Sequence, residues 1–429
     1  METTKLLVKQ ARIIDPNSPH HLSVKDILIE NDQVKTIADT LSADDDTKVI
    51  EHKNMHISPG WFDLRANFCD PGHEEREDLE SGIHAAIFGG FTAVGISPET
   101  SPAIDSKADI EYIYQQAEGF PVSLYPYGSL SKGLHGEELS EMYDMYQAGA
   151  VAFSHGKKPL TNAALMKLAL LYGKSFAPPV HVFAMDESLS RGGQMHEGEV
   201  STYLGLKGIP QLAEEVAMLR DLHLATYAES GIHFMAVSSA SGVSLLQNAH
   251  EKGTPFTADV AVANLFFTDA ELENYDTRYK TLPPLRGEED RQALIEALKE
   301  DLIQVITSDH TPVDIENKKC EFDQAEFGVI GLETLFGALG TLQNDGLEIE
   351  DIISKIAINP RKVLGMDIPS VTEGSWAEFT FFDPTEKWTF TKKDIQSKSH
   401  NSPFIGRELQ GKALGIVNNG ILVWKEPFD

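Results

Sequence analysis

The sequence predicts an α/β fold: a (β/α)8 TIM-type barrel joined to a composite β-sandwich that the N- and C-terminal segments form together. Three observations predict it. Short strand-like runs occur at both ends of the chain, and between them apolar strands alternate with amphipathic helices. The chain also has neither a G-x-G-x-x-G motif nor a P-loop, which argues against the structural alternative, a doubly wound open sheet.

Residues 1–54 alternate apolar and polar side chains in short runs such as LLVKQARIID, DILIEND and VKTIAD. The C-terminal segment has the same texture in AEFTFFD and GKALGIVNNGILVWKE, where the NNG at 418–420 predicts a hairpin turn. Period-two alternation is typical of half-buried strands. We therefore assign residues 1–54 and 366–429 to the sandwich and residues 55–365 to the barrel.

The barrel strands are predicted from short apolar runs that end in polar residues. Besides the run that ends at Asp63, the candidates lie at 92–97, 122–128, 150–154, 179–183, 233–238, 255–260 and 302–309. Helix-length amphipathic segments lie between them, at 80–90, 108–119, 136–149, 160–173, 209–231 and 288–301. Several of these segments end in Gly, as a helix C-cap does.

Composition narrows the class of protein. The chain has 36 basic and 66 acidic side chains, and its formal net charge of −30 repels phosphate backbones and anionic lipid. We therefore expect no nucleic-acid partner and no membrane partner. Two cysteines, Cys69 and Cys320, are too few for a disulfide framework, and no apolar run reaches the roughly 20 residues of a membrane span. The sequence predicts a cytoplasmic protein.

In a barrel of this type the functional side chains lie at the carboxyl ends of the strands. The polar residues at those positions are Asp63, Arg65, Asn67, Ser97, Ser154, His155, His181, His233, Asp259, Asp309 and His310. These residues are the candidates for catalysis, metal binding or substrate binding.

The stretch PGWFDLRANFCDPGHEEREDLESGIHAAIFGGFTAVGISPET resembles the opening of dihydroorotases of the amidohydrolase superfamily, the ring-closing enzymes of pyrimidine synthesis. YKTLPPLRGEEDRQALIEAL, ITSDHTP, FGVIGLETLFGAL and SKSHNSPFIGRELQGK resemble later parts of the same family, in the same order. The resemblance spans nearly the whole chain. It implies the barrel-and-sandwich fold, chemistry on a cyclic amide, and a pair of divalent metals, often zinc, that polarise the carbonyl and supply hydroxide.

The resemblance also places the family's metal ligands on this sequence, and most of them are absent. The His-x-His pair after the first strand falls on Arg65 and Asn67, and the second histidine of the sixth strand falls on Ala236. His181 and Asp309 remain. In the family, the position of Asp309 is a metal ligand and the general base.

Other family positions have changed as well. The aspartate of the fourth strand has no counterpart in the segment SHGK at 154–157. The substrate-gripping Arg falls on Cys69 and a substrate-contacting Asn falls on Leu282, and Cys69 cannot form a bidentate bridge to a carboxylate. The acidic residues after the fifth-strand histidine are replaced by Phe183 and Ala184. Four metal ligands and two substrate contacts are therefore lost together.

A catalytic zinc takes three protein ligands and a water, so the two remaining ligand positions predict no metal and a vestigial Asp309. A guanidinium in place of a metal ion keeps a buried carboxylate compensated, because it is always charged. We therefore predict that Arg65 pairs with Asp309. For any other molecule bound at the barrel mouth, the candidate contacts are Arg65, Asn67, His155 and His310.

Three functions stay open. The first is a non-catalytic relative of dihydroorotase with a structural or regulatory role in a homodimer or a hetero-oligomer, and the resemblance implies aspartate transcarbamoylase as a partner. The second is an active dihydroorotase or related cyclic amidohydrolase with a rebuilt zinc site. The third is a small-molecule binder that needs no metal. The lost ligands favour the first function, which requires no cofactor.

Overall fold

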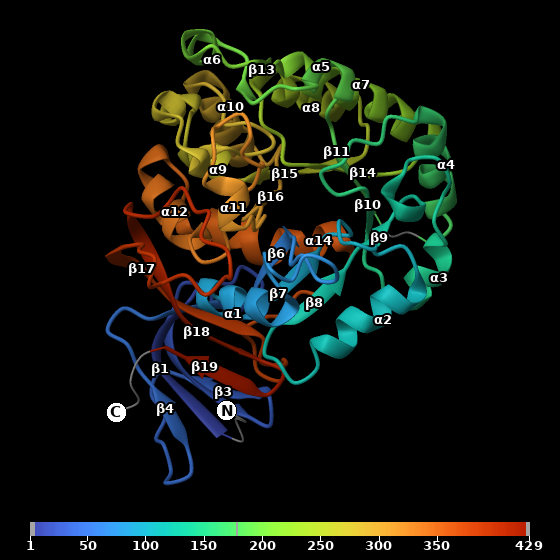
Figure 1. Cartoon of the computed structure of the whole chain (residues 1–429). Helices are drawn as coiled ribbons and strands as arrows, with labels where there is room; N and C mark the ends of the chain where they lie inside the picture. Colours follow the sequence, from blue (N-terminus) through green and yellow to red (C-terminus); the bar gives the residue numbers. More distant parts are fainter. Residues whose placement is uncertain (1–4, 177–178, 426–429) are drawn as a thin grey trace.

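The computed structural model describes residues 5–176 and 179–425, and in it parallel strands surround one axis inside a layer of helices (Figure 1). The strands pair in the orders β6-β7-β8 and β9-β10-β11-β14-β15-β16. Their bounds are β6 Trp61–Ala66, β7 Phe91–Ile96, β8 Ser123–Pro126, β9 Gly128–Ser129, β10 Phe153–Ser154, β11 Val180–Phe183, β14 Ile232–Met235, β15 Phe256–Ala261 and β16 Val305–Thr307.

Only Tyr127 separates β8 from β9, so the two strands fill one position of the barrel. Tyr127 continues the ladder, because its N–H donates to Ile96 O at 2.9 Å. The barrel closes between its first and last strands, where the Asn67 N–H donates to His310 O at 2.9 Å. The predicted TIM-type barrel is confirmed.

Helices cover the outside of the barrel. The longer ones are α1 Leu79–Gly89, α2 Lys107–Gln116, α4 Ala163–Gly173, α7 Gln211–Ala228, α8 Ala240–Glu251 and α10 Glu288–Lys299, and the shorter ones are α3 Met142–Gln147, α5 Glu187–Ser190, α6 Glu199–Leu204, α9 Val262–Phe266, α11 Ile315–Lys318, α12 Leu335–Thr341, α13 Ile349–Ile353 and α14 Asn359–Leu364. The strands β12 Met195–His196 and β13 Gly208–Ile209 form a small sheet between α5 and α7.

The predicted helix at 136–149 is wrong in its first half, since α3 begins only at Met142. The Ser140 N–H donates to Leu130 O at 3.2 Å, and the Lys132 N–H donates to Glu138 O at 3.0 Å. The residues before α3 therefore pair with the loop that follows β9. The predicted Gly C-cap is present on α1, which Gly90 ends with φ 91°, whereas α2, α3, α4 and α7 have Ala117, Ala148, Lys174 and Glu229 as their C-caps. At the start of α1, Asp78 accepts from the Ser81 N–H, an N-cap that was not predicted.

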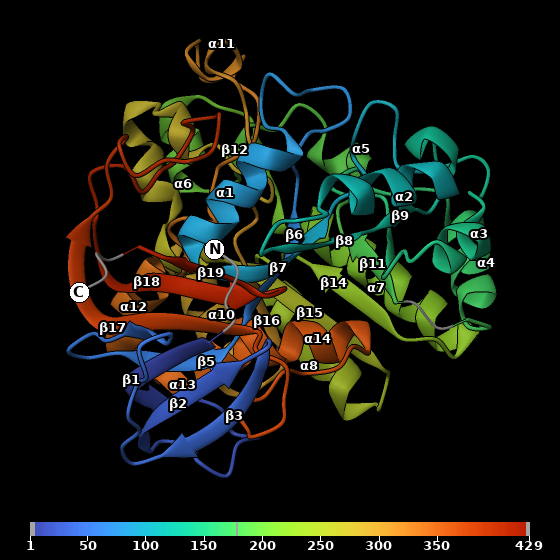
Figure 2. The same ribbon diagram turned by 90° about the horizontal axis from the view of Figure 1, so that it is seen from below.

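The two ends of the chain form one mixed sheet in the order β19-β18-β17-β5-β1-β2-β3, with β4 paired to β1, beside the barrel (Figure 2). The bounds are β1 Lys5–Ile13, β2 Val24–Glu30, β3 Gln33–Ala38, β4 Lys48–Ile50, β5 His56–Pro59, β17 Phe379–Thr389, β18 Glu408–Asn418 and β19 Ile421–Trp424. Because β17 runs antiparallel to β5, the two segments share one apolar core, which includes Ile57, Phe379 and Leu414. The composite sandwich is confirmed, and its domain boundaries stay a prediction.

The predicted hairpin turn joins β18 to β19. Asn418 pairs with Ile421, so the turn has two central residues, Asn419 with φ 51° and Gly420 with φ 71°. Positive φ at both positions is what a type I′ turn requires. No helix in the described part of the chain is long and apolar enough to cross a membrane.

Candidate functional site

Two cations meet the carboxylate of Asp309 at the carboxyl end of the barrel. Arg65, on β6, donates from Nη1 to Oδ1, and Lys157, in the loop after β10, donates from Nζ to Oδ2 at 2.7 Å. Arg65 and Asp309 are buried and Lys157 is nearly so. The predicted pairing of Arg65 with Asp309 is confirmed.

Asp259, on β15, extends this network to a second carboxylate. It accepts from Arg65 Nη2 at 3.2 Å, from His233 Nε2 at 2.9 Å and from the Ala236 N–H at 2.8 Å. Burial alone raises the pKa of a carboxyl, but the Arg65 charge and the His233 hydrogen bond hold the pKa of Asp259 well below its usual range. Asp259 is therefore ionised, and with Asp309 it forms a four-charge network with Arg65 and Lys157.

Lys157 reaches the network because of the turn before it. Gly156 has φ +60°, and a Cβ at this position would lie 2.1 Å from Cδ of Glu99. A residue with a side chain is strained at such a φ and would also displace Glu99. Lys157 Nζ also donates to Thr311 Oγ1 at 3.3 Å. From this segment, the sequence predicted His155, and not Lys157, as a contact at the barrel mouth.

His181, one of the two retained ligand positions, lies beside the network without joining it. Its ring lies 4.2 Å from the ring of His233 and meets Tyr127 edge-on at 5.0 Å, and neither ring nitrogen has a hydrogen-bond partner among the described residues. Burial lowers the pKa of His181 well below its ordinary value. His181 is therefore a neutral ring packed against two others.

The remaining mouth candidates point to other partners. His155 Nε2 lies 2.6 Å from Ser131 Oγ, and burial lowers the pKa of His155 to about 4. His310 Nε2 lies 3.4 Å from Glu77 Oε2. Asn67 Oδ1 accepts from the Cys69 N–H at 2.8 Å, which fixes the loop after β6. The structure therefore brings Arg65, but not His155, His310 or Asn67, to Asp309.

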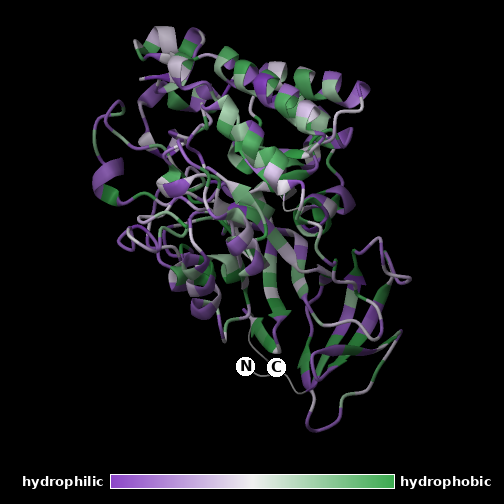
Figure 3. Cartoon of the chain, turned by 90° about the vertical axis from the view of Figure 1, so that its right-hand side faces the viewer, coloured by the Kyte–Doolittle hydropathy of each residue, from purple (hydrophilic) through white to green (hydrophobic). Residues whose placement is uncertain are grey.

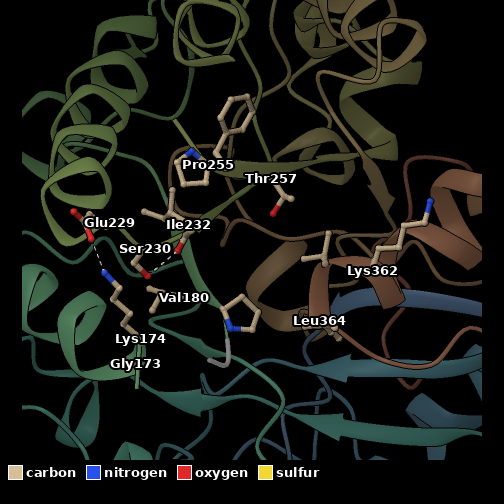
Figure 4. A pocket seen from close by; sticks show the side chains of 15 residues that line it. Gly173, Lys174, Val180, Glu229, Ser230, Ile232, Pro255, Thr257, Lys362 and Leu364 are labelled. Atoms are coloured by element: carbon tan, nitrogen blue, oxygen red, sulfur yellow. Dashed lines mark hydrogen bonds and ion pairs between the residues drawn. The ribbon is translucent and has the colours of Figure 1, made fainter. Parts of the chain in front are cut away.

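A cavity of about 690 Å³ opens beside the network and includes Asn67, Cys69, Glu99, His135, Lys158 and Thr311 in its lining. Burial raises the pKa of Cys69 to about 12, so its thiol is not a nucleophile at neutral pH. A second cavity, of about 440 Å³, lies at the opposite end of the barrel, where β11, β14 and β15 begin (Figure 4). That end of a TIM barrel serves stability rather than chemistry.

Known proteins resemble this chain over its full length. The family model described as Dihydro-orotase-like matches residues 55–241. A protein named Dihydroorotase from Geobacter metallireducens is 40% identical and covers 98% of this chain and 99% of its own, and one from Caldicellulosiruptor saccharolyticus is 38% identical over the same shares. The chain belongs to the dihydroorotase family.

Solved structures show the same fold at lower identity. L-hydantoinase (dihydropyrimidinase) from Arthrobacter aurescens has a TM-score of 0.85 with 23% identity, and the two chains are covered to 98% and 96%. Dihydropyrimidinase from Brevibacillus agri has a TM-score of 0.81 with 20% identity, covering 98% and 95%. The fold of this dihydroorotase-family chain, a barrel with a sandwich beside it, is therefore the fold of these two solved structures.

The mouth of this dihydroorotase-family barrel does not fit the metal pair that the resemblance implies. Across residues 5–176 and 179–425, the one group of three or more His, Cys, Asp or Glu with ligand atoms all within 4.8 Å is His52, Asp383 and Glu386, on the sheet of the chain ends. Arg65 has no lone pair to give and repels a cation, and Asp309 already accepts from Arg65 and Lys157.

Several of the altered family positions come together in one apolar cluster. Phe183 and Ala236 are buried in it with Met235, and Leu282 packs against it. In the family, two of these positions carry a ligand and a substrate contact according to the resemblance. At these positions the changes put apolar side chains in place of polar ones, instead of exchanging one set of metal ligands for another.

Proposed function

We propose that this chain is a dihydroorotase-family protein that does not carry out metal-dependent chemistry on a cyclic amide and has a structural or regulatory role. The observation that carries the proposal is the Asp309 carboxylate, held on one oxygen by Arg65 and on the other by Lys157. Two side-chain cations therefore hold the carboxylate that the resemblance makes a metal ligand.

Electrostatics supports this proposal. At an effective dielectric constant of about 20, two like unit charges 4 Å apart repel by roughly 4 kcal/mol, and a divalent ion doubles that cost. A metal next to Asp309 would meet both the Arg65 guanidinium and the Lys157 ammonium. It would also have to displace one of them from a buried carboxylate, and the displaced cation would lose an ion pair inside the protein.

The test is an assay of dihydroorotate hydrolysis with and without added zinc, on wild type and on Asp309→Asn. We expect no turnover above the buffer rate for either protein at any zinc concentration. Zinc-dependent turnover by wild type that is lost in Asp309→Asn would contradict the proposal and establish the alternative, an active enzyme with a rebuilt site.

The partner belongs to the same proposal. The resemblance implies aspartate transcarbamoylase, and a barrel whose mouth is charge-balanced retains its outer surfaces for assembly. Co-purification of the full-length chain with aspartate transcarbamoylase from the same organism, followed by sedimentation of the mixture, tests this assignment. A mixture that sediments as the two separate proteins at micromolar concentrations would contradict it.

The cavity at the mouth favours a second candidate, a small-molecule binder that needs no metal. Its volume of about 690 Å³ is within the usual range for small-molecule sites, and Lys158, His135 and Glu99 offer charged or polar contacts. Calorimetric titration with dihydroorotate in the presence of a chelator is the measurement. Saturable binding that Lys158→Ala weakens supports this candidate, and an absence of heat at millimolar ligand contradicts it for this compound.

A further inference from the structure

A cavity of about 570 Å³ opens beside α11, next to the cavity at the barrel mouth. Four stretches of the chain that are far apart in the sequence line it, at Glu75 and within residues 276–278, 313–319 and 392–405. One of them carries α11, which stands out from the barrel in Figure 2. Because Val313 borders both cavities, this one, which we call the α11 cavity, also lies at the carboxyl end of the barrel.

The lining of the α11 cavity is basic, although the protein is acidic. Over the whole chain, 66 acidic side chains outnumber 36 basic ones, and hydrophilic residues are spread over the outer helices and loops in Figure 3. The lining reverses this balance with five basic side chains, Arg278, Lys318, Lys319, Lys392 and Lys398, against three acidic ones, Glu75, Asp276 and Asp314. A concave site lined by one sign of charge attracts ions of the opposite sign. The α11 cavity therefore favours an anion that the rest of the surface repels.

The three carboxylates of the lining already face guanidinium groups. Asp276 accepts from Arg278 Nε at 3.0 Å. Carboxylate oxygens of Asp314 and Glu75 lie 3.4 Å and 3.8 Å from Nε of Arg76, a residue outside the lining. In the described part of the chain, none of the three forms an ion pair with a lysine of the lining. These carboxylates therefore leave the charge of the lysines only partly balanced.

Two exposed lysines of the lining have no partner. Across residues 5–176 and 179–425, no hydrogen bond or ion pair involves the ammonium group of Lys319 or Lys392. Lys398, by contrast, pairs with Asp78. A single unpaired lysine is ordinary on a protein surface, but two on the wall of one cavity offer two charges to the same ligand.

A third lysine shows that this region lacks negative charge. Lys318 is buried, and its Nζ donates to two neutral acceptors, Thr277 O at 3.0 Å and Lys280 O at 3.3 Å. Burial and the charge of Lys280 lower the pKa of Lys318 to about 7. Lys280 is buried as well and, among the described residues, donates only to neutral acceptors, Gln194 Oε1 and Phe322 O. An anion in the cavity would compensate both ammonium groups.

The size and lining of the cavity indicate the class of anion. Two unpaired ammonium groups match a phosphate group, which carries about −1.5 to −2 charges near pH 7, better than they match a single carboxylate. The volume of about 570 Å³ is in the range of small-molecule sites, so an organic part fits beside the phosphate. Val313, Ile315 and Ile405 give the cavity an apolar side for that part.

We propose that the α11 cavity binds a small phosphomonoester, with the phosphate group at Lys319 and Lys392 and the organic part against Val313, Ile315 and Ile405. This site requires neither a metal ion nor any chemistry at Asp309, and so it is independent of the role proposed for the barrel mouth. A ligand held there joins α11 and the segment at 392–405 to the barrel. Because a ligand that binds only the folded chain stabilises it, binding raises the midpoint of thermal unfolding.

Calorimetric titration of the full-length chain with phenyl phosphate, inorganic phosphate and phenol tests the two sides of the site separately. We expect saturable binding of phenyl phosphate with a dissociation constant below about 1 mM, and weaker binding of inorganic phosphate and of phenol. Added salt should weaken the binding of both phosphates, because the two lysines are exposed. The proposal is overturned if phenyl phosphate gives no saturable heat at about 10 mM, or if phenol or inorganic phosphate binds as tightly as phenyl phosphate.

Variants at exposed positions locate the ligand without disturbing the fold. Lys319→Ala and Lys392→Ala should each weaken phenyl phosphate binding about fivefold, and Lys393→Ala, at the exposed lysine next to Lys392 but outside the lining, should leave it unchanged. Ile315→Ser should weaken the binding of phenyl phosphate and leave that of inorganic phosphate unchanged. Binding that survives both lysine variants, or that Lys158→Ala at the mouth cavity removes, would overturn the assignment to the α11 cavity.

Discussion

Replacing Arg65 with Met removes the cation that joins the two buried carboxylates Asp309 and Asp259. Breaking a buried ion pair by removing one partner costs about 3–5 kcal/mol. Asp309 retains Lys157 at 2.7 Å, and Asp259 retains His233 at 2.9 Å, so we expect the lower end of that range, about 3 kcal/mol. We therefore expect Arg65 to contribute to the stability of the chain.

A double-mutant cycle with Lys157→Met measures how the two cations share Asp309. With either cation removed, the other still compensates the carboxylate, and with both removed it is left buried and unpaired. The double variant should therefore lose about 1–3 kcal/mol more than the sum of the single variants. Lys174→Met is the matched control, because Lys174 pairs with Glu229 on the surface and such pairs contribute about 0–1 kcal/mol.

Thermal unfolding followed by calorimetry at several pH values is the assay. The pKa of Asp259 is held below its ordinary value of 3.8 in the folded protein, so its ionised form stabilises the fold above that pH and the contribution is lost as pH falls. Arg65→Met removes part of this contribution. The difference in free energy of unfolding between wild type and the variant should therefore be largest at pH 7 and should become smaller below about pH 4. An Arg65→Met protein that is as stable as Lys174→Met at pH 7 would contradict this prediction. So would a double variant whose loss of stability equals the sum of the losses of Arg65→Met and Lys157→Met.

Three further predictions concern other groups. Burial raises the pKa of Asp63 from 3.8 to about 6, so ionisation of Asp63 costs stability as pH rises. In the same calorimetric series, the free energy of unfolding of Asp63→Asn relative to wild type should increase by about 2.4 kcal/mol between pH 4 and pH 7. Gly156→Ala should cost at least about 1 kcal/mol in thermal unfolding, because of its positive φ and the contact with Glu99. A thiol reagent at pH 8 should modify Cys320 and leave Cys69 unmodified until the protein unfolds, as peptide mapping would show.

The fold was predictable because it follows from local patterns. Strand candidates at 92–97 and 255–260 agree within one residue with β7 and β15, since short apolar runs closed by turn residues define buried parallel strands. The pairing of residues 138–140 with the loop after β9 was not predictable, because GEELSEMYDMYQAG has helical composition and only a tertiary contact prevents the first turns from forming.

The site was predictable in part. That Arg65 must pair with a carboxylate follows from its permanent charge in a buried place, and Asp309 is the carboxylate ligand position that the resemblance shows as retained. Lys157 and Asp259 were missed as partners because they lie 152 residues before Asp309 and 194 residues after Arg65 in the chain, and only barrel closure brings them together. His155 was predicted as a mouth contact because it ends a predicted strand, whereas the Gly156 turn directs the following lysine inward.

If side-chain cations take the place of metal ions at the barrel mouth, the protein should bind no zinc there. Elemental analysis of the full-length protein, incubated with excess zinc and then passed through a desalting column, measures this directly. We expect well under one zinc per chain, unchanged by Asp309→Asn. One or two zinc ions per chain in wild type, lost in Asp309→Asn, would contradict it.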